Sequence, residues 1–472
     1  MALERLDSWY GRPGRDGLSA QRVLPQVPGD LSGTPPGPRL PRHPLGVWWL
    51  LREHDLLARC RRRYGPVFSL RAWPLGFMVV VADPAEVKGV FMGDPAVLHA
   101  GEGNGVMRPV AGPESVLLLD GERHLHRRKL MLPSFHGERL GVYEELIASI
   151  AHAEIDRWTV GSEFAIHPAM QAITLRVILG AVFGIEDAAR RDELERLLGR
   201  LINSPALLWP FLQYDLGPRS PWRRFLALRD RVDSLIFAEI ERKRSDPELA
   251  SRDDILSLLL QARDEQGQPM SDAELRDQLI TLLLAGHETS ASALAWTFER
   301  LVRNPHVLLR LRTRLADGDQ DYLDCVIKES LRSRPIVGLA MRLVTAPTSV
   351  GGYTVPAGTF LAASIILMHS DPEFYPDPDA FLPERFADKR ADTYTWIPFG
   401  GGMRRCLGAS FAMFEMRIVL RAVLERCELG APRGRPERAR RRFVTYPPDR
   451  GARVLLERRV SAEAVARDAA PV

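Results

Sequence analysis

The residues between Ser271 and Arg303 constrain the fold of this 472-residue chain more than any other segment. Ser271 and Glu274 have the S-x-x-E spacing of a capping box, which begins a helix, and Asn304-Pro305 ends it. About 33 residues at ~1.5 Å each give a rod of roughly 50 Å, which must cross a whole domain. We therefore expect a long central helix over 271–303 whose middle is buried.

The middle of this helix reads Ala285-Gly286-His287-Glu288-Thr289-Ser290, which conflicts with burial. Glycine weakens a helix interior, and Glu and Thr side chains are costly to bury. Such conflicts tend to fall at functional sites. Glu288 and Thr289 are therefore candidate functional residues; the alternative is that Thr289 only hydrogen-bonds back to a helix carbonyl. His287 is interpreted as a neighbour in the helix groove, not as a metal ligand.

Most of the remaining chain has helical periodicity, with short β segments near both ends. Residues 67–70 and 78–81 carry β-branched and aromatic side chains, and 351–358 predicts two further strands with tight turns. The expected fold class is mainly α with a minor β sheet. We divide the chain into an irregular N-terminal segment (1–40), a single domain (41–460) and a loose C-terminal tail (461–472).

Composition excludes several classes of protein. Hydrophobic residues make up 45% of the chain and the net charge is +4, which is ordinary for a globular protein and does not indicate nucleic-acid binding. No apolar run reaches the ~18 residues of a membrane span. The stretch Leu45–Leu51 is interpreted as core packing, with shallow membrane contact as the alternative. The four cysteines lie far apart, so we expect neither a disulfide framework nor a zinc site, and a cytoplasmic location.

One cysteine follows a glycine-rich turn and precedes an apolar helix. The segment Pro398–Gly408 places Cys406 just before the helix expected over 411–424. A helix N-terminus and nearby N–H groups lower the pKa of a thiol and so stabilise the thiolate, and glycines let the backbone approach a sulfur or a flat cofactor closely. A lone cysteine here would be interpreted as a buried structural residue. The spacing F-x-x-G-x-R-x-C-x-G changes that interpretation, because five residue types meet it together: Phe399, Gly402, Arg404, Cys406 and Gly408.

This segment resembles the haem-binding loop of the cytochrome P450 family. The resemblance implies a triangular helical prism around a buried haem b, with Cys406 as the thiolate ligand of the iron. It implies that Arg404, His124, Arg128 and Arg342 bind haem propionates and that Phe399 packs beside the thiolate. Glu329, Arg332 and Arg385 match a buried structural triad. Further motifs stand in the family's order, so the resemblance covers roughly residues 40–460.

The motif at 285–290 is similar to the family's oxygen-activation motif, with Glu288 and Thr289 as its acid–alcohol pair. The implied function is a bacterial monooxygenase (EC 1.14 class) that inserts one oxygen atom from dioxygen into a hydrophobic substrate. A substrate pocket is expected near Ala285, Gly286, Val337 and Leu339. By resemblance, segments 105–119, 201–216, 283–289, 336–340 and 444–446 would line it; the apolar side chains at 201–216 include Leu207, Leu208, Trp209 and Phe211. Its substrate would be a fatty acid, terpenoid or polyketide-like molecule, as in hydroxylases of secondary metabolism.

Electrons would come from a ferredoxin or flavodoxin and its NAD(P)H reductase. The docking patch for that partner would be basic, with Arg405 and any of Arg404, Arg127, Arg128 and Lys129 not used on propionates. We expect a monomer without nucleic-acid or transmembrane partners. Two alternatives remain. A peroxide-using or substrate-rearranging haem-thiolate enzyme is disfavoured by the intact Glu288–Thr289 pair, and a non-catalytic haem protein by the complete cysteine loop.

Overall fold

The computed structural model describes residues 31–460 except 73–75, 136, 186, 205–216, 218 and 388–391. Within this part of the chain, 31–40 forms turns and irregular backbone. The predicted C-terminal tail and the first thirty residues lie outside the described residues, as do Leu207, Leu208, Trp209 and Phe211. The division of the chain into segments therefore stays a prediction.

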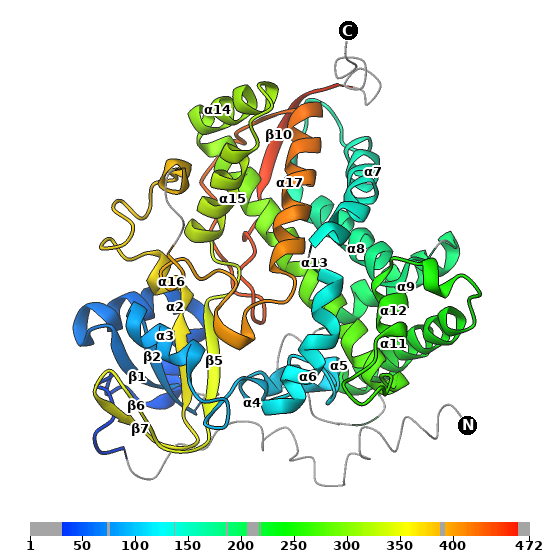
Figure 1. The fold of residues 1–472 in the computed structure, drawn as a ribbon. Coiled ribbons are helices and arrows are strands. Elements are labelled where there is room, and N and C mark those ends of the chain that lie inside the picture. Colours follow the sequence, from blue (N-terminus) through cyan, green and yellow to red (C-terminus); the bar gives the residue numbers. More distant parts are fainter. Residues whose placement is uncertain are drawn as a thin grey trace.

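Helices dominate the molecule (Figure 1), which confirms the mainly α fold class. The longer helices of the first half are α2 (Arg42–Tyr64), α3 (Pro84–Met92), α6 (Gly121–Met131), α7 (Glu144–Ile155), α8 (Ile166–Phe183), α9 (Ala188–Ile202) and α11 (Pro221–Arg244). Those of the second half are α12 (Ile255–Gln261), α13 (Asp272–Arg303), α14 (Pro305–Ala316), α15 (Asp321–Ser333) and α17 (Ala409–Arg426). Short helices are α4 (Ala100–Gly103), α5 (Arg108–Ala111) and α16 (Ile365–His369).

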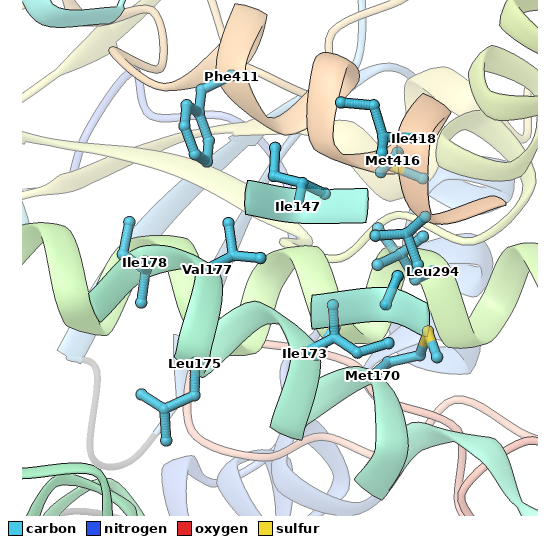
Figure 2. Close-up of a cluster of buried hydrophobic side chains, with 14 of the residues drawn as sticks. Ile147, Met170, Ile173, Leu175, Val177, Ile178, Leu294, Phe411, Met416 and Ile418 are labelled. Carbon is cyan, nitrogen blue, oxygen red and sulfur yellow. The ribbon is translucent and has the colours of Figure 1, made fainter. Parts of the chain in front are cut away.

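Helix α13 is the predicted central rod. Ser271 and Glu274 form the reciprocal capping box, and Asn304 is the C-cap residue. Helix α8 packs along α13, and α7 and α17 complete this part of the core. Figure 2 shows Ile147 of α7, Val177 of α8, Leu294 of α13 and Met416 of α17 gathered between these helices. Among the described residues, α8 is the one helix long and apolar enough to span a membrane, and 72% of its apolar window is buried.

The main sheet has five strands in the order β1 (Val67–Ala72), β2 (Gly76–Val81), β8 (Phe360–Ser364), β5 (Leu339–Val344) and β3 (Leu98–His99). Strand β2 pairs with β8 in parallel, and the other neighbours pair antiparallel. This sheet lies with α2 and α3 at one side of the molecule (Figure 1), where a second hydrophobic core forms. A separate sheet joins β4 (Glu163–Ala165), β10 (Arg453–Arg459) and β9 (Cys427–Gly430).

The prediction of two strands within 351–358 is confirmed for one strand only, because the other lies wholly before residue 351. Strands β6 (Thr348–Val350) and β7 (Tyr353–Val355) pair in a hairpin. Gly351 and Gly352, with φ of 58° and 79°, form its two-residue turn. A positive φ at both turn positions suits the twist of the flanking strands and favours glycine there.

Candidate haem-thiolate site

The loop before Cys406 is shaped by its glycines. Gly400 and Gly402 have φ of 66° and 62°, the left-handed region that other residues rarely adopt. A Cβ on Gly402 would lie 2.1 Å from the carbonyl oxygen of Phe91, so the loop packs tightly against α3. The N–H of Cys406 donates to the carbonyl of Phe399 at 2.9 Å and closes the turn. The loop therefore holds the Cys406 backbone in one position.

Cys406 differs from the other cysteines, because its side chain is exposed whereas Cys60, Cys325 and Cys427 are buried. It nevertheless lies deep inside the protein, and this burial raises the pKa of its thiol. The N–H of Gly408 and the charges of Arg128 and Arg405 act in the opposite direction and favour the thiolate. An accessible sulfur deep inside the protein lies beside interior space where a ligand can reach it.

The middle of α13 also has accessible surface. Leu283 and Ser290 are buried, but Ala285 is exposed and Thr289 is half-buried. Ala285 and Thr289 are four residues apart and share one face of the helix. A Cβ on Gly286 would instead lie 3.0 Å from Ile178, so this glycine allows the close approach of α8. The face with Ala285 and Thr289 is thus the part of the central helix that an interior ligand can contact.

The side chains of Glu288 and Thr289, the predicted acid–alcohol pair, point in different directions. The hydroxyl of Thr289 donates back to the carbonyl of Ala285 at 2.5 Å, the bond considered above as the alternative interpretation. The Glu288 carboxylate points toward α8, where it accepts a hydrogen bond from Gln171 Nε2 at 2.7 Å. Burial raises the pKa of Glu288, and Gln171 and Arg442 lower it in part. The two side chains therefore have different partners although they are neighbours in the chain.

The sequence did not identify the residues around Glu288. Its Oε1 atom lies 3.6 Å from His167 Nε2 and 3.7 Å from Arg442 Nη1, and it is buried without a hydrogen bond. Burial, followed by the charge of Arg442, lowers the pKa of His167 to about 4, which keeps this imidazole neutral at pH 7. Gln171 and His167 lie on α8, whose sequence is mainly apolar, so it does not indicate polar partners for Glu288. The run of arginines around Arg442 is the one sequence feature that could have suggested a partner for this acid.

His287 faces α8 as well. Its Nδ1 atom lies 3.1 Å from the hydroxyl of Thr174, which also donates to the His287 carbonyl at 3.0 Å. Burial, followed by the charges of His167 and Arg442, lowers the pKa of His287 to about 4. These contacts are those of a side chain packed between α13 and α8, as predicted for His287.

The four predicted propionate ligands form one cluster of three arginines and His124. His124, Arg342 and Arg404 line a pocket with Asp120 and Phe91. Burial lowers the pKa of His124 to about 4, and the charges of Arg404, Arg128 and Arg342 contribute. Burial and the charge of Arg404 lower the pKa of Arg342 to about 10. So close a group of cations disfavours its own charge and favours an anion beside it.

Only one arginine of this cluster has a carboxylate partner. Arg404 pairs with Asp120 at 2.5 Å and also donates to the carbonyls of Val116 and Leu119. Arg342 is buried, and its guanidinium donates a hydrogen bond to the carbonyl of Met341 at 2.9 Å. In the described part of the chain, no carboxylate lies within 4 Å of Arg342 or Arg128. A soft thiolate ligand, the arginines Arg342 and Arg128 without a carboxylate partner, and an accessible helix face fit a haem with its two propionates.

The predicted triad is a buried ion-pair network. Arg332 binds both oxygens of Glu329 at 2.7 and 2.8 Å, and Arg385 Nε lies 3.6 Å from Glu329 Oε1. The guanidinium of Arg332 also donates to the carbonyls of His369, Pro378 and Ala380. His369 in turn accepts the N–H of Ile397 at 2.9 Å, a structural contact that we did not predict. The network thus fixes the start of the segment that leads to Cys406.

Two of the other predicted pocket residues, Val337 and Leu339, lie beside and within strand β5. Val337 and Leu339 are half-buried, and a backbone bridge pairs Val337 with Thr445. Val444 beside that bridge is 43% exposed. Phe399 packs edge-on against Trp396, with 6.2 Å between the ring centroids.

Comparisons with known proteins agree with this geometry. The family model for cytochrome P450 matches residues 35–452. Cytochrome P450 135B1 of Mycobacterium tuberculosis is 43% identical over 432 residues, covering 90% of this chain and 91% of that protein. Cytochrome P450 135A1 of the same organism is 40% identical and covers 90% and 95%.

Solved structures give the same result for the fold. A retinoic acid-bound cyanobacterial CYP120A1 superposes with a TM-score of 0.79 at 26% identity, covering 90% of this chain and 99% of that one. The heme domain of cytochrome P450DA, at 22% identity, has a TM-score of 0.77 and covers 91% and 99%. The match across the whole domain, together with the cysteine loop, shows that this chain belongs to the cytochrome P450 family.

Proposed function

We propose that this protein is a haem b-dependent monooxygenase that oxidises an apolar small molecule, with Cys406 as the iron ligand. The observation that carries the proposal is the accessible Cys406 sulfur deep inside the fold, just before the N-terminus of α17 and near the arginines Arg128 and Arg405. In a structural role, this sulfur would be packed against apolar side chains, as in the other three cysteines.

The residues present divide the work of holding the cofactor. Cys406 would ligate the iron, Arg342, Arg404, His124 and Arg128 would hold the propionates, and Gly408 would donate its N–H to the sulfur. When bound, haem supplies the activation of dioxygen that attack on an unreactive C–H bond requires. The role of the chain is to orient the substrate and to deliver protons.

Thr289 and Glu288 would handle these protons. While Thr289 Oγ1 donates to the Ala285 carbonyl, its lone pairs remain available to accept a hydrogen bond from a proton donor. The raised pKa of Glu288 brings this carboxyl closer to neutral pH, where it can both release and take up a proton. Its orphaned Oε1 and its contact with the partly exposed Arg442 support a link between the interior and solvent.

Electrons would come from an external ferredoxin or flavodoxin reduced by an NAD(P)H-dependent reductase. The basic patch available to such a partner is smaller than the sequence suggested. Arg127 pairs with Glu274, and Arg404 pairs with Asp120. Lys129 is exposed and has only a weak, exposed pair with Glu265 at 3.1 Å. Arg405 remains exposed beside the cysteine loop. Changing Arg405 to Glu should slow reduction by ferredoxin without loss of haem.

The substrate class proposed is fatty acid, terpenoid or polyketide-like. Ala285, Val337 and Leu339 present apolar surface, and the solved relative at 26% identity binds retinoic acid, a mainly apolar molecule. We propose that the enzyme is a hydroxylase of secondary metabolism and that it acts as a monomer in the cytoplasm. A screen of such ligands for the low-spin to high-spin shift would identify the substrate.

The decisive experiment is carbon monoxide difference spectroscopy of the reduced holoprotein. Thiolate ligation predicts the red-shifted Soret band, and Cys406→Ser should lose it while Cys325→Ser keeps it. An unshifted band in well-folded protein, or an unchanged band in Cys406→Ser, would overturn the proposal. Product formation with ferredoxin and NADPH, compared with peroxide alone, then separates a monooxygenase from a peroxide-using enzyme; no product from any ligand that shifts the spin state would indicate a non-catalytic haem protein.

A further inference from the structure

The first part of α2 is apolar on both of its faces. Arg52 has non-helical φ and ψ of −147° and 53°, so Arg42–Leu51 forms a short helix of its own. Leu45 and Trp49 are buried in the second hydrophobic core. On the opposite face Val47 is 52% exposed and Leu51 is 78% exposed, with Leu50 beside them at 38%. A surface helix ordinarily carries polar residues on its outer face.

This exposure is concentrated in one place. Of the eleven large hydrophobic side chains exposed in the described part of the chain, four lie within Leu40–Leu51. Single exposed apolar residues are normal on a protein surface, but a group of them marks a site of interaction. We call Val47, Leu50 and Leu51 the α2 apolar face; Leu40 lies just before the helix.

The charges next to the α2 apolar face are mainly basic, and the nearest exposed acid is Asp55. The sequence from Leu31 to Arg52 contains no Asp or Glu, and Arg39, Arg42 and Arg52 are exposed. The first acidic side chain that Arg52 meets is Asp55 at 3.5 Å, and both are largely exposed, so this pair is weak. Trp48 lies at the edge of the face, under the guanidinium of Arg59. Exposed aliphatic residues, flanking arginines and a tryptophan are typical of helices that lie in a membrane interface.

We propose that the α2 apolar face binds the surface of a membrane rich in anionic lipids. Val47, Leu50 and Leu51 would enter the boundary between headgroups and acyl chains, and Arg39, Arg42 and Arg52 would lie among the headgroups. The helix is far too short to span a bilayer, so the contact is peripheral. This inference does not depend on the haem chemistry, although an apolar substrate would partition into the same membrane.

A second copy of this chain fits the face less well than a membrane does. In a two-fold symmetric dimer each face would meet itself. The arginines of one copy would then oppose those of the other, with no carboxylate in the same segment to pair with them. Anionic headgroups offer the complementary charge instead.

The test is flotation of the holoprotein with vesicles. We expect at least tenfold stronger partitioning into phosphatidylcholine vesicles that contain phosphatidylglycerol than into pure phosphatidylcholine, and weaker binding at high salt. The double variant Val47→Glu/Leu51→Glu should lose at least tenfold in partitioning. Leu309→Glu is the matched control, because Leu309 is 68% exposed on α14, and it should bind like wild type. Far-UV circular dichroism checks that all variants are folded.

Three outcomes would overturn the proposal. The first is wild-type partitioning into anionic vesicles that is no stronger than into neutral ones. The second is equal vesicle binding by wild type and the Val47→Glu/Leu51→Glu variant. This outcome overturns the proposal even when a variant without residues 1–30 fails to bind, because binding then depends on those residues and not on the α2 apolar face. The third is a wild-type dimer in sedimentation that this variant converts to monomer without any vesicle binding by either protein.

Discussion

Replacing Arg332 by alanine should destabilise the protein far more than replacing Arg385, although both arginines belong to one triad. Arg332 is 1% exposed and Glu329 is fully buried. The substitution removes both bonds to the Glu329 carboxylate and the donors to the carbonyls of His369, Pro378 and Ala380. It leaves a buried carboxylate whose remaining donor is the N–H of Leu382 at 3.0 Å.

The expected cost follows from this geometry. Breaking a buried ion pair from one side costs about 3–5 kcal/mol, because the remaining charge stays desolvated. Arg385 lies 3.6 Å from Glu329, beyond hydrogen-bond distance, and donates to the Asp377 carbonyl at 2.9 Å. Losing that one hydrogen bond costs about 1 kcal/mol. The free energies of unfolding of the two variants should therefore differ by roughly 2–4 kcal/mol.

Urea unfolding of the holoprotein, followed by far-UV circular dichroism, measures this difference. Arg332→Ala should unfold at clearly lower urea than Arg385→Ala, and Arg385→Ala should stay close to wild type. Because Arg332 also fixes the carbonyl of His369, whose imidazole binds Ile397, its loss should broaden the haem absorption band. Equal stability of the two variants would refute the argument that Arg332 is the arginine neutralising Glu329.

Three further predictions concern the cysteine loop, the cationic cluster and a buried acid. Gly402→Ala should cost at least about 2 kcal/mol of stability, because of its φ of 62° and the Phe91 carbonyl; Gly89→Ala on α3, where a Cβ meets nothing within 4 Å, is the control, and equal urea midpoints would contradict this. Arg342→Leu should release haem to an acceptor globin roughly 10- to 100-fold faster, because a charged hydrogen bond contributes about 1.5–3 kcal/mol; an unchanged rate would exclude Arg342 as a propionate ligand. Burial raises the pKa of Glu415 from 4.5 to about 8, so the folded protein holds a proton that the unfolded chain releases, and this stabilisation is lost as pH rises from about 5 to 8. Glu415→Gln should remove that part of the pH dependence, and identical slopes of unfolding free energy against pH in both proteins would contradict it.

Local sequence was enough to predict the central helix and the sheet turn. The capping box at Ser271 and Glu274 determines where α13 begins through hydrogen bonds within four residues. Gly351 and Gly352 determine the hairpin turn, because few other residues adopt their φ values. The glycines before Cys406 work in the same way. Each of these features depends on backbone conformations that neighbouring residues impose.

The sequence by itself also determined the family, because the cysteine loop and the triad motifs occur with fixed spacing. Only the tertiary structure decided what Glu288 contacts: Gln171 and His167 lie on another helix, and Arg442 lies near the C-terminal end of the chain. It also decided that Arg127 and Lys129 pair with acids of distant segments. For Leu45–Leu51, both interpretations of the sequence were open until packing buried one face of the helix and left the other exposed. Side-chain partners brought together by chain folding leave no periodic or local signal, so a single sequence cannot specify them.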